Sequence, residues 1–314
     1  MKLAIKVENL TKYYGKFLAL ENIDFEVREG EIFGFLGPNG AGKTTTQKIL
    51  TGILKPSGGH VSILGYDMEK DPYNAKRFTG IVPDETNAYV DMNAWDNLTL
   101  IGELYGMPKK NIEVKARELL EIFQLYDRRK DRVKGFSKGM KRRLILSMGL
   151  IHNPKILFLD EPTSGLDVQS TRLIRKMITD LNREGVTVFL TTHDIEEANQ
   201  MCDRVAIIYR GKIAAIDRPE NLKKAVKAAQ SIEVSFDRQV EIIKELEDLP
   251  EVDEVRKQGD KIRLFTREPG KVIRPLVDYA HRNRLEFLTL NTLGPSLEEV
   301  FVKLTEDKES EAGV

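Results

Sequence analysis

The sequence has few of the residues from which a disulfide scaffold or a membrane anchor is built. Of its 314 residues one is cysteine, Cys202, which excludes an internal disulfide and any metal site made of cysteines alone. Apolar runs are short, such as Ile156 to Leu159, whereas a spanning helix needs about 18 consecutive apolar residues. The segment from Met1 to Lys6 alternates apolar and charged residues and predicts a strand, not a signal peptide. We therefore expect a cytosolic chain.

Neither sign of charge is in excess. Lysine plus arginine number 49, as do aspartate plus glutamate, so the formal net charge is zero. This balance gives no general electrostatic reason to bind nucleic acid or an anionic membrane. With 41% apolar and 31% charged residues, and without an internal repeat or a low-complexity tract, the composition is that of a folded globular protein. At roughly 150 residues per domain, the length predicts about two domains.

Residues 1 to about 217 alternate short β-prone runs with longer helical patterns, the order typical of an α/β fold with a mostly parallel sheet. The runs that begin at Ile32, Ile156 and Val186 are apolar on both faces, as in strands covered by helices on each side. The earliest strands predict an added antiparallel β-subdomain. We expect strands at Leu3–Val7, Ile23–Val27, Ile32–Leu36, Ile156–Leu159, Val186–Thr191 and Val205–Tyr209, and helices at Lys43–Leu50, Ile112–Phe123, Lys138–Leu150 and Ser170–Asn182.

From about residue 218 the pattern changes, which predicts a second, α+β domain over residues 218–314. Its elements follow the order βαββαβ, which resembles a ferredoxin-like unit. A last helix is expected to begin at Ser296, because Glu299 three residues later makes a capping box. The other expected elements are Ser231–Phe236, Val240–Leu249, Glu254–Lys257, Lys261–Thr266, Lys271–Arg282 and Glu286–Asn291.

A glycine-rich loop lies between the apolar run Ile32–Leu36 and a helical pattern. It reads Gly37-Pro38-Asn39-Gly40-Ala41-Gly42-Lys43-Thr44. This fits G-x-x-x-x-G-K-[ST] at every fixed position. Such glycines let successive backbone N–H groups point at phosphate oxygens, and the helix N-terminus adds its positive dipole end. We expect Lys43 to reach the β- and γ-phosphates of a nucleotide and the Thr44 hydroxyl to ligate Mg²⁺.

Two carboxylates, Asp160 and Glu161, directly follow the buried run Ile156–Leu159. The carboxyl end of a parallel strand borders the crevice where such sheets bind ligands. Asp160 is placed to hold Mg²⁺, directly or through water. Glu161 is placed to polarise a water for attack on the γ-phosphate.

Three further segments complete a pattern with the phosphate loop and the carboxylate pair. They are Phe136-Ser137-Lys138-Gly139-Met140, Ser164-Gly165-Leu166-Asp167 and His193. In this order and spacing, residues 1 to about 217 resemble the nucleotide-binding subunit of ATP-binding cassette (ABC) transporters. The resemblance implies a P-loop NTPase with a RecA-like parallel core, an antiparallel β-subdomain and a helical subdomain over about residues 86–152. It also implies ATP and Mg²⁺ as cofactors.

The same resemblance implies roles for single residues. Tyr14 matches the aromatic residue that stacks on adenine, and Asp160 matches the acidic Mg²⁺ residue. Glu161 matches the catalytic base, and His193 matches the switch histidine that contacts the γ-phosphate. The phosphate-loop match comprises Gly37, Pro38, Asn39, Gly40, Ala41, Gly42, Lys43, Thr44 and Thr45.

The signature segment implies a dimer. Its match comprises Ser137, Lys138, Gly139 and Met140. In the family this segment binds the γ-phosphate of the partner subunit's ATP, and Asp167 matches the loop that crosses to the partner. The implied unit is a head-to-tail homodimer, or a pair with a second ATPase subunit. It would sit on the cytoplasmic face of the membrane through a permease of the ABC-2 type, with no nucleic acid involved.

Two departures from the family pattern stand out. Lys138 replaces the usual first glycine of the signature, a form that resembles the exporters of drugs, antibiotics and lipids. Asp84 stands where the family usually has glutamine, or Glu85 if the register slips by one. An aspartate can ligate Mg²⁺ but cannot donate an amide hydrogen bond. Asp84 therefore joins Thr44 and Asp160 as a predicted metal ligand and joins the catalytic set.

Other residues are harder to assign. The region after Asp84 is expected to form the partner surface, through Tyr89, Trp95, Leu98, Leu104 and Tyr105. Trp95 and Tyr105 fit either a groove that receives the permease or the core of the helical subdomain. Cys202 is expected to be a small buried residue. The C-terminal domain is expected to stabilise the dimer or regulate it, or less readily to bind a small ligand. A solvated helix face is the preferred interpretation of the basic cluster Lys138, Lys141, Arg142 and Arg143.

The resulting hypothesis is the ATPase subunit of an exporter, driven by ATP-dependent dimerisation. One alternative is a cassette ATPase that acts on a ribosome, on DNA or on a cell-envelope remodelling complex. Another is a nucleotide-gated scaffold that has lost hydrolysis, against which the intact Glu161 and His193 argue.

Overall fold

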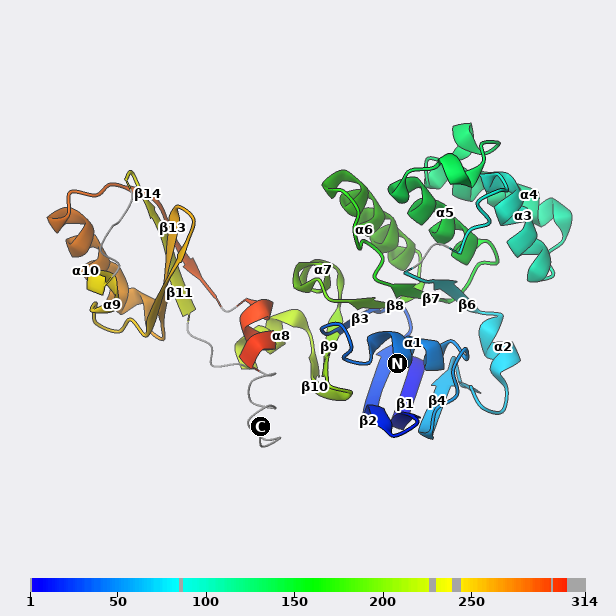
Figure 1. The fold of residues 1–314 in the computed structure, drawn as a ribbon, viewed down its shortest axis with the longest axis horizontal. Helices are drawn as coiled ribbons and strands as arrows, with labels where there is room; N and C mark the ends of the chain where they lie inside the picture. The colour runs from blue at the N-terminus through cyan, green and yellow to red at the C-terminus, as the bar shows by residue number, and fades with distance from the viewer. Residues whose placement is uncertain (1, 85–86, 226–229, 239–243, 295, 304–314) are drawn as a thin grey trace. The chain divides into compact units, whose positions relative to one another are not determined.

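The computed structural model describes residues 2–84, 87–225, 230–238, 244–294 and 296–303. The chain divides into two compact units, Met1–Pro219 and Glu220–Val314 (Figure 1). Each unit has its own sheet and its own hydrophobic core.

A six-stranded sheet forms the centre of the first unit, with strand order β10-β9-β3-β8-β7-β6. All neighbouring pairs are parallel except β9 and β10. Every residue of β3, β7 and β8 is buried, which confirms the expectation from their apolar runs. The strands are β3 (Ile32–Leu36), β6 (Thr79–Val82), β7 (Ile156–Asp160), β8 (Thr187–Thr192), β9 (Arg204–Tyr209) and β10 (Lys212–Asp217).

The predicted antiparallel β-subdomain is a second sheet, with strand order β2-β1-β4-β5. Its first two strands are longer than the sequence predicted, because the chain continues through several register shifts to a tight turn at Gly15. The strands are β1 (Leu3–Tyr14), β2 (Phe17–Arg28), β4 (Gly58–Ile63) and β5 (Tyr66–Asp67). Figure 1 shows α1 (Lys43–Leu50) between this sheet and the central one, with contacts to strands of both.

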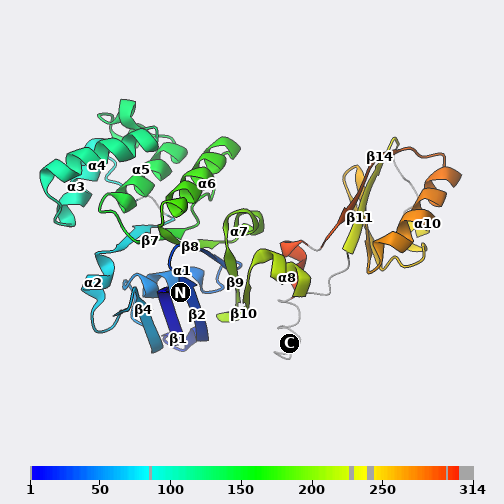
Figure 2. The ribbon, with the colours of Figure 1, turned by 180° about the vertical axis from the view of Figure 1, so that it is seen from behind.

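Helices cover both faces of the central sheet. Seen from the front and from behind, α5 (Lys138–Leu150) and α6 (Val168–Arg183) lie on the face opposite α1 (Figures 1 and 2). A helical group of α3 (Ala94–Leu104), α4 (Lys109–Ile122) and α5 extends beyond the β6 edge. The remaining helical elements of this unit are α2 (Pro72–Lys76), η1 (Tyr126–Arg128), η2 (Val133–Gly135) and α7 (Ile195–Met201).

The second unit has the predicted βαββαβ order, after α8 (Pro219–Ala225). Its sheet is antiparallel with strand order β12-β13-β11-β14. The capping box is present, since Ser296 and Glu299 exchange two hydrogen bonds. Of the helix expected at Val240–Leu249, residues 240–243 lie outside the described residues. The elements are β11 (Gln230–Phe236), α9 (Lys244–Glu247), β12 (Glu254–Gln258), β13 (Lys261–Thr266), α10 (Pro269–Arg282) and β14 (Phe287–Leu293).

Candidate active site

The phosphate loop joins the carboxyl end of β3 to α1. Gly42 precedes the helix with φ 111°, a left-handed conformation, and a Cβ there would lie 2.6 Å from Leu20 Cδ2. Only glycine fits both conditions. No side chain caps α1, and its first turn holds no acidic residue, so the backbone N–H groups are available to an anion.

Lys43 is the first residue of α1 and is 6% exposed. Its Nζ donates hydrogen bonds to the Gly37 carbonyl at 2.8 Å and to the Pro38 carbonyl at 3.2 Å. The same Nζ lies 3.4 Å from Glu161 Oε1. The loop therefore orients the ammonium group toward the carboxylates at the end of β7.

The two carboxylates lie in different environments. Asp160 is buried at the end of β7 and accepts a hydrogen bond from the Thr191 hydroxyl on β8. Glu161, one residue further, has φ 47°, a strained conformation for a residue with a side chain. Its Oε2 lies 2.7 Å from His193 Nδ1. A carboxylate only accepts, so in this contact Nδ1 carries the proton.

Lys43, Asp160 and Glu161 border one cavity of about 360 Å³. Of the described residues predicted at the site, Gly37, Pro38, Ala41 and His193 are not among its lining residues. The cavity collects side chains from β1, β2, the phosphate loop and the carboxyl ends of β6 and β7, so ten predicted site residues meet there. Phe17 and Ala19 on β2 also line it and were missed by the sequence analysis. Phe17 pairs with Tyr14 across the β1–β2 hairpin, a signal that only the strand register supplies. The lining residues are Tyr14, Phe17, Ala19, Asn39, Gly40, Gly42, Lys43, Thr44, Thr45, Asp84, Asp160 and Glu161.

The donor set of this cavity suits Mg²⁺. Thr44, Asp84 and Asp160 present hydroxyl and carboxylate oxygens, the hard ligands that this ion prefers, and Mg²⁺ usually takes its other ligands from phosphates and water. Among the described residues, no group of three or more His, Cys, Asp or Glu side chains is placed to hold a metal ion. Glu85, the alternative to Asp84, lies outside the described residues.

The signature segment lies elsewhere on the unit. Ser137 caps α5, its hydroxyl accepting from the Met140 N–H at 3.2 Å, and Asp167 caps α6, accepting from the Ser170 N–H at 2.8 Å. The hydrogen bonds from Ser170 lower the pKa of Asp167. A Cβ on Gly139 would lie 2.6 Å from Ser170 Oγ, so the starts of the two helices touch. Among the described residues, the cavity lining includes none of Ser137, Lys138, Gly139, Met140 or Asp167.

Arg142 corrects the interpretation of the basic cluster. It was grouped with solvated residues, yet it is 6% exposed and its guanidinium donates to the backbone carbonyls of Asp160 and Glu161. Burial lowers the pKa of Arg142, against the opposing charges of Asp84 and Asp160. A signal was available, because Gly139, Arg142 and Leu146 follow helical spacing and share the buried face of α5.

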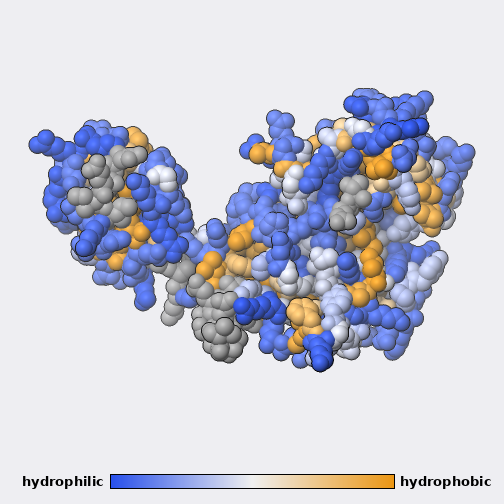
Figure 3. Space-filling view, in the orientation of Figure 1, coloured by the Kyte–Doolittle hydropathy of each residue, from blue (hydrophilic) through white to orange (hydrophobic). Residues whose placement is uncertain are grey.

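The residues expected at a partner surface divide between core and surface. Leu98 is fully buried and Trp95 is half-buried, whereas Leu104 is 70% exposed. Tyr105 is 42% exposed and stacks on His152, whose pKa is lowered by burial. Hydrophobic surface over the helical group is visible in Figure 3. Cys202 is buried as expected, against Gly34.

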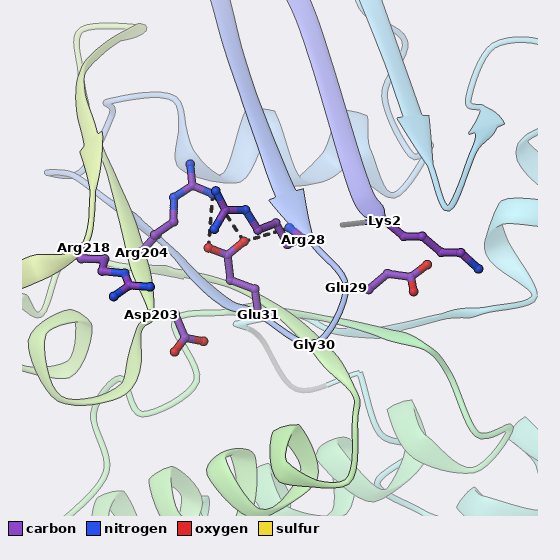
Figure 4. Close-up of a pocket in the computed structure, with 8 residues that line it drawn as sticks. All are labelled: Lys2, Arg28, Glu29, Gly30, Glu31, Asp203, Arg204 and Arg218. Carbon is purple, nitrogen blue, oxygen red and sulfur yellow. Dashed lines mark hydrogen bonds and ion pairs between the residues drawn. The ribbon is translucent and has the colours of Figure 1, made fainter.

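A second cavity, of about 490 Å³, lies at the amino end of β3 (Figure 4). Three of its charged side chains, those of Glu31, Asp203 and Arg204, bind to the protein itself. Glu31 pairs with Arg204 at 3.2 Å and accepts from the Arg28 N–H, and Asp203 accepts from the Ile32 N–H. These contacts join the β2–β3 turn to β9.

The comparisons with known proteins agree with this geometry. The ABC transporter family profile matches residues 20–164. The linearmycin resistance ATP-binding protein LnrL of Bacillus subtilis is 35% identical over 304 residues, which are 96% of this chain and 98% of LnrL. The chain belongs to the ABC transporter family. The doxorubicin resistance ATP-binding protein DrrA of Mycobacterium tuberculosis is 35% identical over 322 residues, with 97% of this chain and 94% of DrrA covered.

Solved ABC structures share the fold of the first unit. A dimeric bacterial ABC transporter cassette superposes with a TM-score of 0.63 at 28% identity, covering 68% of this chain and 98% of the cassette. The chain is therefore an ATP-binding, ATP-hydrolysing subunit of an ABC transporter, a family whose ATPase subunits dimerise and work with a membrane permease. Among the described residues, no helix has the length and apolar character needed to cross a bilayer.

Proposed function

We propose that this chain energises an exporter, through ATP-driven head-to-tail dimerisation on the cytoplasmic face of a permease of the ABC-2 type. One observation carries the proposal. The phosphate loop, the carboxylates and Tyr14 share one cavity, while the capped start of α5 lies outside it. In this proposal the phosphate loop with the uncapped start of α1 is one half of a site, and the capped start of α5 is the other half. Two copies of the chain, arranged head to tail, form two complete sites. Relatives named for linearmycin and doxorubicin resistance support the direction of transport.

In the proposed mechanism, the backbone N–H groups from Gly37 to Thr45 hold the phosphates and Lys43 neutralises their charge. Tyr14, with Phe17 beside it, stacks on the adenine ring. Thr44, Asp160 and Asp84 would hold Mg²⁺, which would further neutralise the charge on the phosphates. Each of these residues lies on a strand, just after the end of one, or in the phosphate loop, so the strands fix their relative positions.

Glu161 acts as the general base. Its Oε2 accepts from His193, and its Oε1 faces Lys43, so both carboxylate oxygens have a cationic or hydrogen-bonding neighbour. These contacts orient the carboxylate toward the position of the γ-phosphate, where it takes the proton of an attacking water. His193 is half exposed, and in this proposal it contacts the γ-phosphate itself.

The partner subunit completes the site. Ser137 to Met140 present a helix start, a hydroxyl and N–H groups to the γ-phosphate of the partner's ATP. Asp167, at the adjacent start of α6, belongs to the loop that extends to the partner subunit. In this proposal residues 1–217 form the ATPase domain, with a helical subdomain at about 86–152, and residues 218–314 form an accessory domain.

The permease is proposed to dock on the helical group. Tyr89 and Val90 are exposed, and their loop is held by Asn97, which bonds to the Tyr89 N–H and carbonyl at 2.8 and 3.0 Å. Leu104 and Tyr105 add exposed apolar surface at the end of α3. The loop enters from β6, next to Asp84, so a docked permease would lie close to the nucleotide cavity.

Gel filtration tests the dimer. Glu161→Gln should bind ATP without hydrolysing it and elute as a dimer in MgATP and as a monomer without nucleotide. Glu184→Gln, an exposed glutamate at the end of α6, serves as the control and should show no trapped dimer. If Glu161→Gln stays monomeric at millimolar MgATP, the dimerisation mechanism is wrong.

Affinity capture tests the partner. Tagged Glu161→Gln protein, expressed in its host with MgATP added, should recover a polytopic membrane protein from solubilised membranes. Substituting Trp95 or Leu104 by alanine should reduce that recovery. Recovery of ribosomes, nucleic acid or soluble envelope proteins in its place would support the non-transport alternative and contradict the exporter.

A further inference from the structure

Arg142 on α5 binds two chain segments that border the nucleotide cavity. Its Nη1 donates to the carbonyls of Pro83 at 2.5 Å and Asp84 at 3.1 Å, just after β6. Its Nη2 donates to the carbonyls of Asp160 at 2.6 Å and Glu161 at 2.7 Å. Its Nε donates to the Pro162 carbonyl at 2.8 Å. One side chain thus contacts the backbone of the metal-ligand segment and of the general base.

These five hydrogen bonds match the five N–H donors of a guanidinium group. The donors lie in one plane and diverge in fixed directions, so the group holds its acceptors at fixed relative positions. A lysine cannot replace it, because an ammonium group is a compact point charge with three donors.

The electrostatic environment explains why the charge is tolerated at 6% exposure. Burial lowers the pKa of Arg142, and attraction to the carboxylates offsets part of that lowering; Asp84 and Asp160 contribute most, and Glu197 and Glu161 contribute less. Asp84, where the ABC pattern usually has glutamine, thus supplies a negative charge that favours the buried positive one.

The hydrogen bond from Arg142 helps to fix the backbone conformation of Glu161. Its left-handed backbone, with φ 47°, is held on both sides, since its N–H donates to the Thr191 carbonyl at 3.1 Å and its carbonyl accepts from Arg142. Strained backbone of this kind persists only where the surroundings determine it.

We propose that Arg142 is a positioning residue that couples the start of α5 to Asp84 and Glu161 of the same chain. This inference rests on the proposed function, in which the start of α5 binds the partner's ATP. Arg142 lies five residues after Ser137 on one rigid helix, so a displacement of that helix by the partner's nucleotide moves the carbonyls of both cavity segments together. Occupancy of one site of the dimer thereby adjusts the general base of the other.

A purely structural role makes a different prediction. If Arg142 only stabilised the fold, its loss would lower the melting temperature, and ATP binding and turnover would fall together as the protein unfolds. A positioning role separates these quantities, because the phosphate loop binds ATP without contacting Arg142.

The experiment compares Arg142→Gln and Arg142→Lys with a matched control, Arg143→Gln. Arg143 is the next residue of α5 and donates to the Phe123 carbonyl, away from the cavity. We expect Arg142→Lys, which keeps the charge, to retain the melting temperature and the equilibrium affinity for ATP while kcat falls by about 100-fold, as for a misplaced catalytic group. Arg142→Gln should lose at least as much, and Arg143→Gln should turn over ATP like the wild type.

The dimer readout separates this inference from the proposed function. In the Glu161→Gln background, adding Arg142→Lys should weaken the MgATP-dependent dimer in gel filtration, whereas adding Arg143→Gln should leave it intact. If Glu161→Gln alone fails to dimerise, the proposed function is wrong. If it dimerises, and folded Arg142→Lys protein has wild-type kcat or loses kcat, melting temperature and ATP affinity in parallel, the positioning role is overturned. If Arg142→Gln does not fold, the kcat, melting temperature and ATP affinity of Arg142→Lys alone test the positioning role.

Discussion

Each end of β3 borders a cavity lined by charged side chains, but only the cavity at the carboxyl end is proposed to bind a nucleotide. At the carboxyl end, α1 has no side-chain cap, and the Lys43 ammonium is held by backbone carbonyls beside Glu161. At the amino end, Glu31 and Arg204 form an ion pair with each other. The amino-end cavity is the larger of the two, about 490 against 360 Å³. A ligand site is therefore marked by polar groups left free to bind, and cavity size is a poor guide.

The largest expected effect is at the carboxyl end. Glu161→Gln removes the proposed general base and should lower kcat by about 1,000-fold, since positioned acid–base groups contribute about 10²–10⁴-fold. ATP affinity should be retained, because the amide still occupies the carboxylate's place. Steady-state turnover and equilibrium binding measure the two quantities. A variant with wild-type kcat would remove Glu161 from the mechanism.

At the amino end the same kind of substitution should act on stability alone. Glu31→Gln keeps an acceptor for the Arg28 N–H but loses the ion pair with Arg204, and should lower the free energy of unfolding by about 2 kcal/mol. Denaturant unfolding measures the loss. Turnover measured at a temperature well below the melting temperature should match that of the wild type. A turnover defect in a variant with wild-type stability would show that the amino-end cavity contributes to function.

A smaller effect is expected at the aromatic wall of the nucleotide cavity. Tyr14→Ala and Phe17→Ala should each raise the Kd for ATP about tenfold, in line with the energy of stacking on a base, and leave kcat at saturation unchanged. Tyr73→Ala removes an aromatic side chain that is 74% exposed and does not line the cavity, so it is the control. An unchanged Kd for Phe17→Ala would leave Tyr14 as the adenine contact.

The smallest effect concerns a second buried glutamate, Glu197 on α7. It accepts from the Thr163 hydroxyl at 2.6 Å, and Arg175 lies 3.7 Å away, yet burial raises the pKa of Glu197 above its usual 4.5. The folded state thus binds this proton more tightly than the unfolded state. The corresponding stability is complete below pH 4.5 and is lost as pH rises through the raised pKa.

Glu197→Gln should remove this pH dependence, since the amide oxygen still accepts from Thr163 and carries no charge. Between pH 4.5 and 8, the unfolding free energy should fall further in the wild type than in the variant. Parallel pH profiles would show that Arg175 fully compensates the charge.

Four elements were predictable to the residue. The elements β3, α1, α5 and β13 have the bounds that their residues predict, because each is a buried run or an amphipathic period bounded by glycine, serine or a turn. The helix expected at Ser170 begins instead at Val168, since Asp167 caps it. Most candidate site residues meet in one cavity because they follow neighbouring strands of one parallel sheet.

Contacts between distant segments were not predictable in this way. Phe17 joins Tyr14 only through the register of the β1–β2 hairpin. Arg142 is one of four basic residues within six positions, and its neighbours in sequence are solvent-accessible. Only the packing of α5 against the ends of β6 and β7 turns its guanidinium inward.

Residue type and spacing along the chain were enough to indicate the family, the phosphate loop, the carboxylate pair and the order of elements in the second unit. In the first unit they left β4, β5, β6 and β10 unpredicted. Which charges pair with each other, and which groups face the cavity, depends on the packing of distant segments. That packing also gave Glu161 its strained backbone and Arg142 its five carbonyl acceptors. The reason is physical: a charge is tolerated away from water only by partners that folding brings from other parts of the chain.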